Sequence, residues 1–149
     1  MKSKIILIPP VYLFICIVAT ALLRWLAPVL NWMAFPFTLG GLVFIGAGVY
    51  WIARAHRSLT QHATPVTFAP STCVIHEGIY RRSRNPMYVG FVLFLVGCSI
   101  LSGNILSLLC PLLFFLVLDR MFVPFEEEKM ENTFGKEYLE YKQSVRRWL

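Results

Sequence analysis

The sequence is poor in charged side chains for its length. Asp, Glu, Lys and Arg together make up 15% of the 149 residues, whereas 57% of the residues are hydrophobic. In a soluble domain about a quarter of the residues are charged. This scarcity of charge argues against a soluble domain and indicates an integral membrane protein. The length allows a single domain over residues 1–149.

The sequence also lacks the cysteine patterns that hold metals or disulfide frameworks. Cys16, Cys98 and Cys110 lie inside apolar runs, and Cys73 lies in a more polar segment between them. Neither a Cys-x-x-Cys pair nor a Cys/His ligand spacing is present. We therefore expect four buried free thiols and no metal site.

Long apolar runs are abundant, and a run of about 20 residues predicts a membrane-spanning helix. The expected spans lie at 5–23, 35–53, 87–101 and 105–123. Only residues 102–104 separate the last two runs, so these should form a tight antiparallel helical hairpin. The sequence thus predicts an all-α polytopic membrane protein with four transmembrane helices.

The distribution of basic residues predicts the orientation of these spans. Of the 14 Lys and Arg residues, all except Arg24 fall before the first run, within the loop 54–86, or from Arg120 onward. Cytoplasmic segments carry such an excess of positive charge. Both termini, the loop 54–86 and the tail 124–149 are therefore expected in the cytoplasm. The membrane topology then explains the excess of positive charge, and nucleic acid is not an expected partner.

Two further expectations concern location. Glu77 and the acids from Asp119 onward fall on the same cytoplasmic side as the basic residues, so any chemistry is expected at that interface. The protein would be multi-pass in the plasma or inner membrane or in the endoplasmic reticulum. A cleavable signal peptide is an alternative for the N-terminal run. That run is long for such a peptide and contains Pro9 and Pro10, so we expect it to be retained.

The stretch GIYRRSRNPMYVG, residues 78–90, joins a basic loop to the third span. Proline is favoured at the first position of a helix and asparagine at its cap, so we expect this helix to begin at Pro86 with Asn85 as cap. The amides of Met87 and Tyr88 would then be unpaired and could bind a carboxylate or phosphate. The ordinary alternative is that the arginines set the topology and the tyrosines anchor the interface.

The tail contains acidic residues and an apolar face. Glu126 and Glu127 fall in a first helical turn, which the helix dipole alone explains. Apolar residues recur at helical spacing, with Gly135 as an expected interruption: Met130, Phe134, Tyr138, Tyr141, Val145 and Trp148. The tail either packs on the membrane surface as an amphipathic helix or folds back over the central loop. In the second case the glutamates face the arginine-rich turn, and the pocket suits a zwitterionic small molecule.

These two motifs together resemble a known family. Residues 78–90, followed by an apolar hairpin and then EEEKMENTFGKEYLEYKQSVRRW, are similar to the isoprenylcysteine carboxyl methyltransferase family and its phospholipid methyltransferase relatives. The family pattern is G-x-Y-R-x-x-R-H-P-x-Y-x-G, followed by E-E-x-x-L-x-x-x-F-G-x-E-Y-x-x-Y-x-x-x-V-P-R. Its V-P-R end matches Val145, Arg146 and Arg147, where the proline, and with it a turn, is lost. The resemblance covers roughly residues 62–149. It implies an integral membrane methyltransferase that uses S-adenosylmethionine and a lipophilic or membrane-associated acceptor.

The resemblance also implies a set of site residues. The matched positions of the cofactor wall are Thr72, Cys73, Val74, Ile75, Tyr80, Arg84, Asn85, Pro86, Met87, Tyr88, Glu126 and Glu127. The F-G-x-E-Y element matches Phe134, Gly135, Glu137 and Tyr138, with Tyr141 following. Glu127 and Arg120 are the implied catalytic residues.

Two departures from the family pattern bear on the chemistry. Asn85 stands where the family has histidine, so it keeps a hydrogen-bonding side chain but cannot titrate near neutral pH. The family's substrate-binding arginine falls at Phe122, and Arg120 could replace it only from two residues earlier. The second departure weakens the expectation of a carboxylate as acceptor.

Two other functions stay open. An R-x-x-R-[HN]-P turn with a downstream Glu pair also resembles membrane sterol reductases, which use NADPH and are much longer. A non-enzymatic module whose basic loop binds anionic lipid is the other alternative. The acceptor of a methyltransferase, whether carboxylate, amine or thiol, is not fixed by the sequence. Nor is the oligomeric state.

Overall fold

A computed structural model describes residues 8–62 and 73–149, which are helical with no named strand. The α-helices are α1 (Pro9–Leu26), α2 (Gly41–Gln61), α3 (Pro86–Ser102), α4 (Leu109–Val117), α5 (Val123–Phe134) and α6 (Lys136–Ser144). Short 3-10 turns lie between several of these helices, and a π-helical turn, Leu118–Phe122, joins α4 to α5. The all-α prediction is confirmed.

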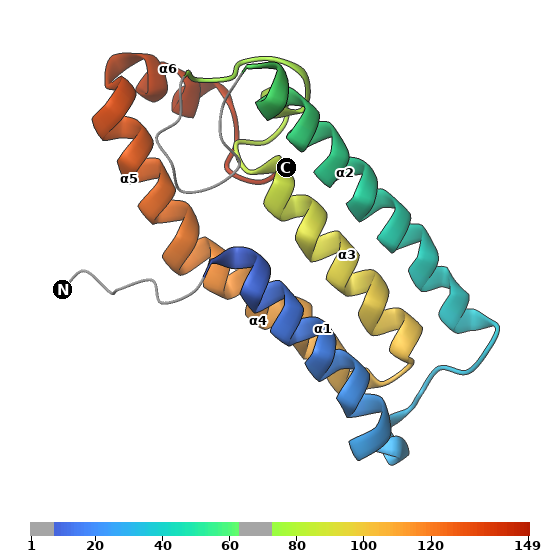
Figure 1. Ribbon diagram of the computed structural model, residues 1–149. Coiled ribbons are helices and arrows are strands. Elements are labelled where there is room, and N and C mark those ends of the chain that lie inside the picture. The colour runs from blue at the N-terminus through green and yellow to red at the C-terminus, as the bar shows by residue number, and fades with distance from the viewer. Residues whose placement is uncertain (1–7, 63–72) are drawn as a thin grey trace.

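The helix α3 lies in the middle of the bundle (Figure 1). It packs along α2 on one side and against α1 and α4 on the other. The rod formed by α4 and α5 runs past the start of α3, and α6 folds back at that end. The C-terminus therefore lies beside the start of α3, although the two are far apart in sequence (Figure 1).

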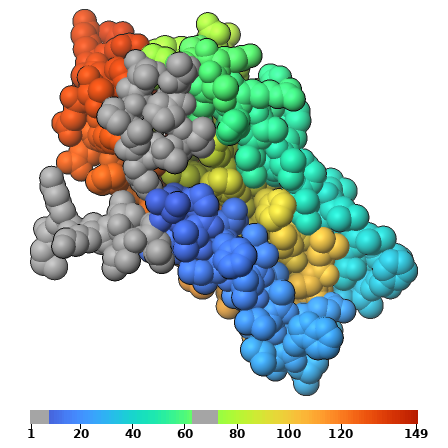
Figure 2. Space-filling model, in the orientation of Figure 1, coloured from blue at the N-terminus to red at the C-terminus, as the bar shows by residue number. Residues whose placement is uncertain are grey.

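Three helical segments are long and apolar enough to cross a membrane. These are Pro9–Leu26, Phe37–Gln61 and Ile105–Phe134, whereas Pro86–Ser102 is apolar but shorter. Many large apolar side chains on α1 and α2 are exposed, as expected for surfaces in contact with lipid. Figure 2 shows a strip of α3 between α1 and α2 on this face of the molecule. Three of the expected spans are thus supported by length and composition, and the fourth stays a prediction.

Glycines set the contact between α2 and α3. A Cβ added to Gly48 would lie 2.7 Å from the carbonyl oxygen of Gly90, and one added to Gly97 would lie 2.6 Å from that of Gly41. The two pairs define an antiparallel register in which backbone meets backbone without intervening side chains. This seam fixes the first turn of α3 level with the part of α2 near Ile52, so that α2 continues about two turns beyond the start of α3.

The helix α2 is longer than the second expected span, whose end in the membrane stays a prediction. The sequence predicted it at residue 53, whereas α2 continues to Gln61 and carries Arg54 and Arg57. Arginine and glutamine are good helix formers, and arginine can lay its apolar stem along the helix while its charge stays in water. The loop is therefore shorter than predicted. Residues 63–72 of it lie outside the described residues.

The helix of the fourth expected span likewise continues beyond residue 123, because α4, the π-helical turn and α5 form one rod to Phe134. Pro124 has no amide hydrogen, and its ring would clash with the carbonyl four residues earlier. The wider turn Leu118–Phe122 lies directly before it and accommodates this clash. The predicted interruption at Gly135 is confirmed, since its φ is 53°.

The tail adopts the second of the two predicted arrangements and folds back over the loop. Tyr138 and Tyr141 of α6 pack with Val74, and Met130, Phe134 and Val145 join them. Trp148 leaves this face and contacts Phe115, with ring centroids 4.8 Å apart.

A polar cluster built mainly from amides and hydroxyls closes the far end of the bundle, at the turn between α3 and α4, where Arg24 also donates to the carbonyl of Ser102. Asn104, which is fully buried, donates from Nδ2 to the carbonyls of Leu23 (3.2 Å) and Ala27 (2.8 Å) and to Asn31 Oδ1 (2.9 Å). Its Oδ1 accepts from the amide of Leu106 at 3.0 Å. The hydroxyls of Ser99, Ser102 and Ser107 form a continuous network beside it. We call this group the hairpin clamp: Asn31, Ser99, Ser102, Asn104 and Ser107.

Candidate functional site

The start of α3 is where the sequence predicted it, but Asn85 does not cap it. The helix begins at Pro86, and the Asn85 side chain makes no capping hydrogen bond. Its Nδ2 instead donates to the carbonyl of Arg147 at 3.0 Å. The oxygen of Ser83 accepts from the Asn85 amide at 3.1 Å, and its hydroxyl donates to the same Arg147 carbonyl at 3.3 Å. The folded-back tail therefore uses the side chain that local sequence assigned to the cap.

Glu127 of α5 lies at the centre of a buried ion cluster. Its Oε1 accepts from Arg84 Nη2 at 2.8 Å, and its Oε2 accepts from Arg147 Nη2 at 2.8 Å. Arg147 Nε also donates to Oε1 at 3.2 Å, and Lys142 Nζ lies 3.6 Å from Oε2. The Arg84 and Glu127 side chains are 9% and 6% exposed. Both oxygens of Glu127 are therefore already held by cations of the chain.

Arg84 also anchors the tail through its other donors. Its Nη1 donates to the carbonyls of Lys142 at 2.7 Å and Val145 at 3.0 Å, and its amide donates to the carbonyl of Arg146 at 3.0 Å. Its Nε is buried and has no hydrogen-bond partner among the described residues. We call residues 145–148 the C-terminal strap, because they lie across the start of α3.

Glu126 has a different environment from its neighbour. Its Oε1 accepts from the hydroxyl of Tyr88 at 2.6 Å. Burial, and secondly the charge of Glu126, raise the pKa of Tyr80, so Tyr80 shares this environment. No hydrogen bond to Glu126 Oε2 occurs within residues 8–62 and 73–149. Glu126 thus keeps one oxygen that a ligand can use.

The segment that follows the undescribed part of the loop also lies at this end. Val74 and Ile75 are buried, and Val74 packs against Tyr138 and Tyr141. The Tyr141 hydroxyl donates to the carbonyl of Tyr80 at 2.8 Å. Burial and then the charge of Glu127 raise the pKa of Tyr138 to about 12. Cys73 is half-buried, and Thr72 lies outside the described residues.

Arg120 is not part of this arrangement. Its side chain is 80% exposed, and Nε lies 3.6 Å from Asp119 Oδ2. Phe122, at the position of the family's substrate-binding arginine, is completely buried in the core. The structure therefore brings Tyr80, Arg84, Tyr88 and the two glutamates together but leaves Arg120 outside.

Sequence reasoning gave no role at this end to three residues: Ser83, Asp119 and Arg147. Asp119 Oδ1 accepts from Trp148 Nε1 at 2.9 Å and lies 3.5 Å from Arg147 Nη1. Ser83 completes the contact between the α3 start and the strap. One signal was available, because an acidic residue inside an apolar run is costly unless a specific partner holds it.

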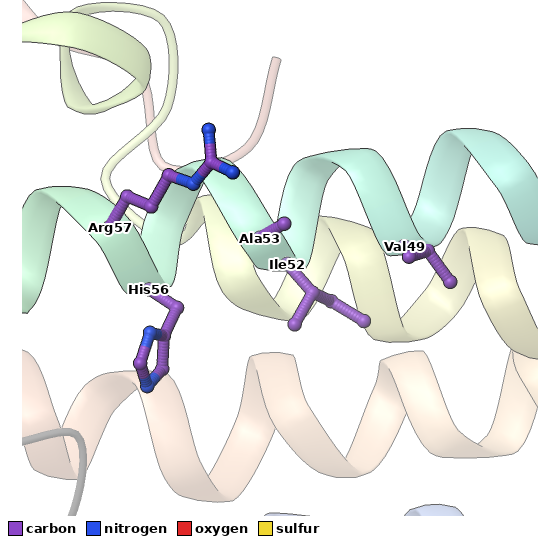
Figure 3. A pocket seen from close by; sticks show the side chains of 5 residues that line it. All are labelled: Val49, Ile52, Ala53, His56 and Arg57. Carbon is purple, nitrogen blue, oxygen red and sulfur yellow. The ribbon is translucent and has the colours of Figure 1, made fainter.

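A shallow groove of about 350 Å³ follows one face of α2 (Figure 3). Its apolar part is formed by Val49, Ile52 and Ala53, and its polar end by His56 and Arg57. Ile52 touches α3, since its Cγ1 lies 2.7 Å from where a Cβ on Gly90 would be. The antiparallel register then brings His56, one turn further along, level with Pro86. The part of the chain that the structure describes holds no cluster of three or more His, Cys, Asp or Glu side chains suited to a metal.

Comparison with known sequences assigns this arrangement to a family. The family described as Phospholipid methyltransferase matches residues 36–137, from the approach to α2 into α6. The chain belongs to the phospholipid methyltransferase family. The match includes Arg84, Tyr88 and both glutamates, whereas the C-terminal strap lies beyond it.

Several curated relatives of this chain are named as methyltransferases. A probable protein-S-isoprenylcysteine O-methyltransferase of Oryza sativa subsp. indica is 37% identical over 109 residues, which are 70% of this chain and 55% of that protein. Protein-S-isoprenylcysteine O-methyltransferase A of Arabidopsis thaliana is 34% identical over 63% of this chain and 47% of its own length. The corresponding protein of Schizosaccharomyces pombe is 29% identical over 83% of this chain and 53% of its own length.

The chain spans about half the length of these relatives. No solved structure matches the sequence.

Proposed function

We propose that this protein is an S-adenosylmethionine-dependent methyltransferase that acts on a lipophilic or membrane-associated acceptor at the cytoplasmic membrane interface. The observation that carries the proposal is the contact of Tyr88 with Glu126 and of Arg84 with Glu127. These pairs join two family motifs that lie 38 and 43 residues apart in the sequence. The names of the curated relatives support the same reaction class.

The residues at this end fit the methionine part of the cofactor, which carries an ammonium and a carboxylate. The free Oε2 of Glu126 can accept from the ammonium or from a ribose hydroxyl. The amides of Met87 and Tyr88 at the start of α3 can donate to the carboxylate. Glu127 is saturated by Arg84, Arg147 and Lys142, so we assign it to holding the site rather than to binding the ligand.

The chemistry requires positioning more than proton transfer. The bound cofactor supplies a sulfonium methyl group, which passes to the acceptor as its carbon–sulfur bond breaks. The chain holds the two partners in line and excludes water, which supplies much of the acceleration for such a transfer. Asn85 cannot act as a base near neutral pH. This restriction favours an acceptor whose nucleophilic atom is already neutral or anionic, so that no base has to remove a proton from it.

The proposed acceptor reaches the site from the bilayer. The groove on α2 supports this route, because its apolar part faces outward along the helix and its polar end lies level with Pro86. In this topology α3 is the third of four spans and both termini are cytoplasmic. At 1.5 Å per residue its 17 residues extend over about 26 Å, close to the ~30 Å of the hydrocarbon core. Arg120 stays a prediction as a catalytic residue, and its outward orientation does not favour it.

Isothermal titration of the purified protein with S-adenosylhomocysteine tests the proposal. We expect saturable binding that weakens at least about tenfold in Glu126→Gln, since a charge-assisted hydrogen bond contributes about 1.5–3 kcal/mol. The matched control is Glu128→Gln, because Glu128 is exposed two residues away on the same helix and should bind like the wild type.

Two results would contradict the proposal. One is the absence of binding by the wild type up to millimolar ligand, and the other is equal affinity in Glu126→Gln. Preferential binding of NADPH in the same titration would favour a reductase instead.

A further inference from the structure

One side chain of the C-terminal strap connects two separate parts of the α4–α5 rod. The guanidinium of Arg147 donates to Glu127 through Nε at 3.2 Å and through Nη2 at 2.8 Å. Its Nη1 lies 3.5 Å from Asp119 Oδ1. Asp119 belongs to the π-helical turn, and Glu127 belongs to α5. Arg147 therefore bridges the segment at which the rod changes its helical pitch.

The same residue is also tied to the start of α3. Its carbonyl accepts from Asn85 Nδ2 at 3.0 Å and from the Ser83 hydroxyl at 3.3 Å. Trp148 adds a second link, because its Nε1 donates to Asp119 at 2.9 Å. The strap thus connects α3, the π-helical turn and α5 through neighbouring residues.

The rotation of α5 about its own axis decides the direction in which the Glu126 side chain points. Adjacent residues on an α-helix project about 100° apart, so Glu126 and Glu127 face different directions and turn together. A π-helical turn is an unfavourable local geometry that neighbouring contacts must stabilise. A turn of α5 that releases Glu127 from Arg147 also takes Glu126 away from the Tyr88 hydroxyl. The contact between Glu126 and Tyr88 therefore depends on the strap.

We propose that Arg147 is a positioning residue of the donor site, holding α5 in the rotation that aims Glu126 at Tyr88 and at the cofactor. The inference rests on the proposed function. Arg147 touches neither Glu126 nor Tyr88 and acts only through Glu127 and Asp119. The family match ends at residue 137, and the likeness of Val145, Arg146 and Arg147 to the V-P-R end of the family pattern gives no role to Arg147.

The test is a double-variant cycle read by S-adenosylhomocysteine titration and by thermal unfolding of the same samples. Arg147→Gln and Tyr88→Phe should each weaken binding at least tenfold. If Arg147 acts through the contact of Glu126 with Tyr88, the double variant should bind no more than about threefold more weakly than Tyr88→Phe alone. Unfolding temperatures should fall additively, because the stabilising contacts of the two side chains are separate.

Matched variants separate positioning from charge. Arg146→Gln should bind like the wild type, because Arg146 is exposed and only its backbone carbonyl is used. Arg147→Lys should fold with little loss of stability, yet bind at least threefold more weakly. A single ammonium cannot bridge Glu127 and Asp119 as the guanidinium fork does. Arg147→Lys also tests the proposal if Arg147→Gln does not fold.

The outcomes distinguish the two proposals. A wild type that does not bind the ligand overturns the proposed function and the positioning role with it. A wild type that binds while Arg147→Gln and Arg147→Lys bind equally well overturns the positioning role alone. The positioning role is also overturned if the loss of affinity in the double variant equals the product of the two single losses. Arg147 and Tyr88 would then act independently.

Discussion

The two ends of α3 carry polar clusters of opposite character. At its C-terminal end the hairpin clamp is built from amides and hydroxyls, and Asn104 satisfies its donors and acceptor within the chain. At its N-terminal end the cluster is charged, with Glu127 held between Arg84 and Arg147. This charged end keeps open capacity, since neither Glu126 Oε2 nor Arg84 Nε has a partner among the described residues.

The difference separates holding the fold from binding a ligand. A neutral network whose members are all satisfied stabilises one arrangement and offers nothing to a ligand. Buried charges are costly to desolvate, and replacing such a pair by apolar residues is often neutral or stabilising. Their presence at the α3 start therefore points to a use other than stability. The following changes test whether the two ends differ in this way.

Arg84→Gln should have the largest effect and should affect both stability and binding. Removing one partner of a buried ion pair typically costs about 3–5 kcal/mol, and here it also releases two hydrogen bonds to carbonyls of the tail. The unfolding temperature and the affinity for S-adenosylhomocysteine should fall together. Arg82→Gln, an exposed change in the same turn, is the control. An Arg84→Gln protein that binds with wild-type affinity would contradict the comparison.

Asn104→Ala should be almost as damaging to stability but harmless to binding. The change removes three donated hydrogen bonds, while the carbonyls of Leu23 and Ala27 keep their backbone donors, so the loss of stability should be about 2–4 kcal/mol in total. The fraction that stays folded should bind S-adenosylhomocysteine normally, because the clamp lies at the opposite end of α3. Thermal unfolding and titration of one preparation measure both quantities. Reduced affinity at unchanged stability would argue against the division between the ends.

Arg120→Ala should have the smallest effect. The side chain is 80% exposed and contacts only its neighbour Asp119, so stability should change by about 0.5 kcal/mol or less. Binding should be unchanged. A labelled-methyl transfer assay with membrane extracts provides the second measurement. Loss of transfer with normal cofactor binding would restore Arg120 as a residue that contacts the acceptor.

Local chemistry was enough to predict several of these features. The start of α3 at Pro86 follows from the fixed φ of proline and its missing amide, and the short turn after α3 follows from the spacing of apolar runs. The approach of the glutamates to the arginine-rich turn was predicted as one of two alternatives. It depended on Gly135 ending α5 and on the apolar face of the tail.

Features that depend on distant partners were not predictable in the same way. The side chain of Asn85 bonds to a carbonyl 62 positions later, and that competition overrides its preference for capping. Local sequence does not show which of Arg146 and Arg147 reaches Glu127, and only the fold decides it. The end of α2 was missed because charged residues were taken to end the helix, whereas they continue it.

The glycine seam limits how the molecule can open to admit a substrate. Because the backbones of α2 and α3 touch at two levels, no side chain or lipid tail can enter between them. These two helices must then move together as one rigid unit. By contrast, α1 and α4 meet α3 through larger side chains such as Leu13, Cys16 and Phe114, which can change rotamer. Any transient opening between helices is thus confined to the flank formed by α1 and α4, whereas the groove on α2 is an outer surface that needs no such opening.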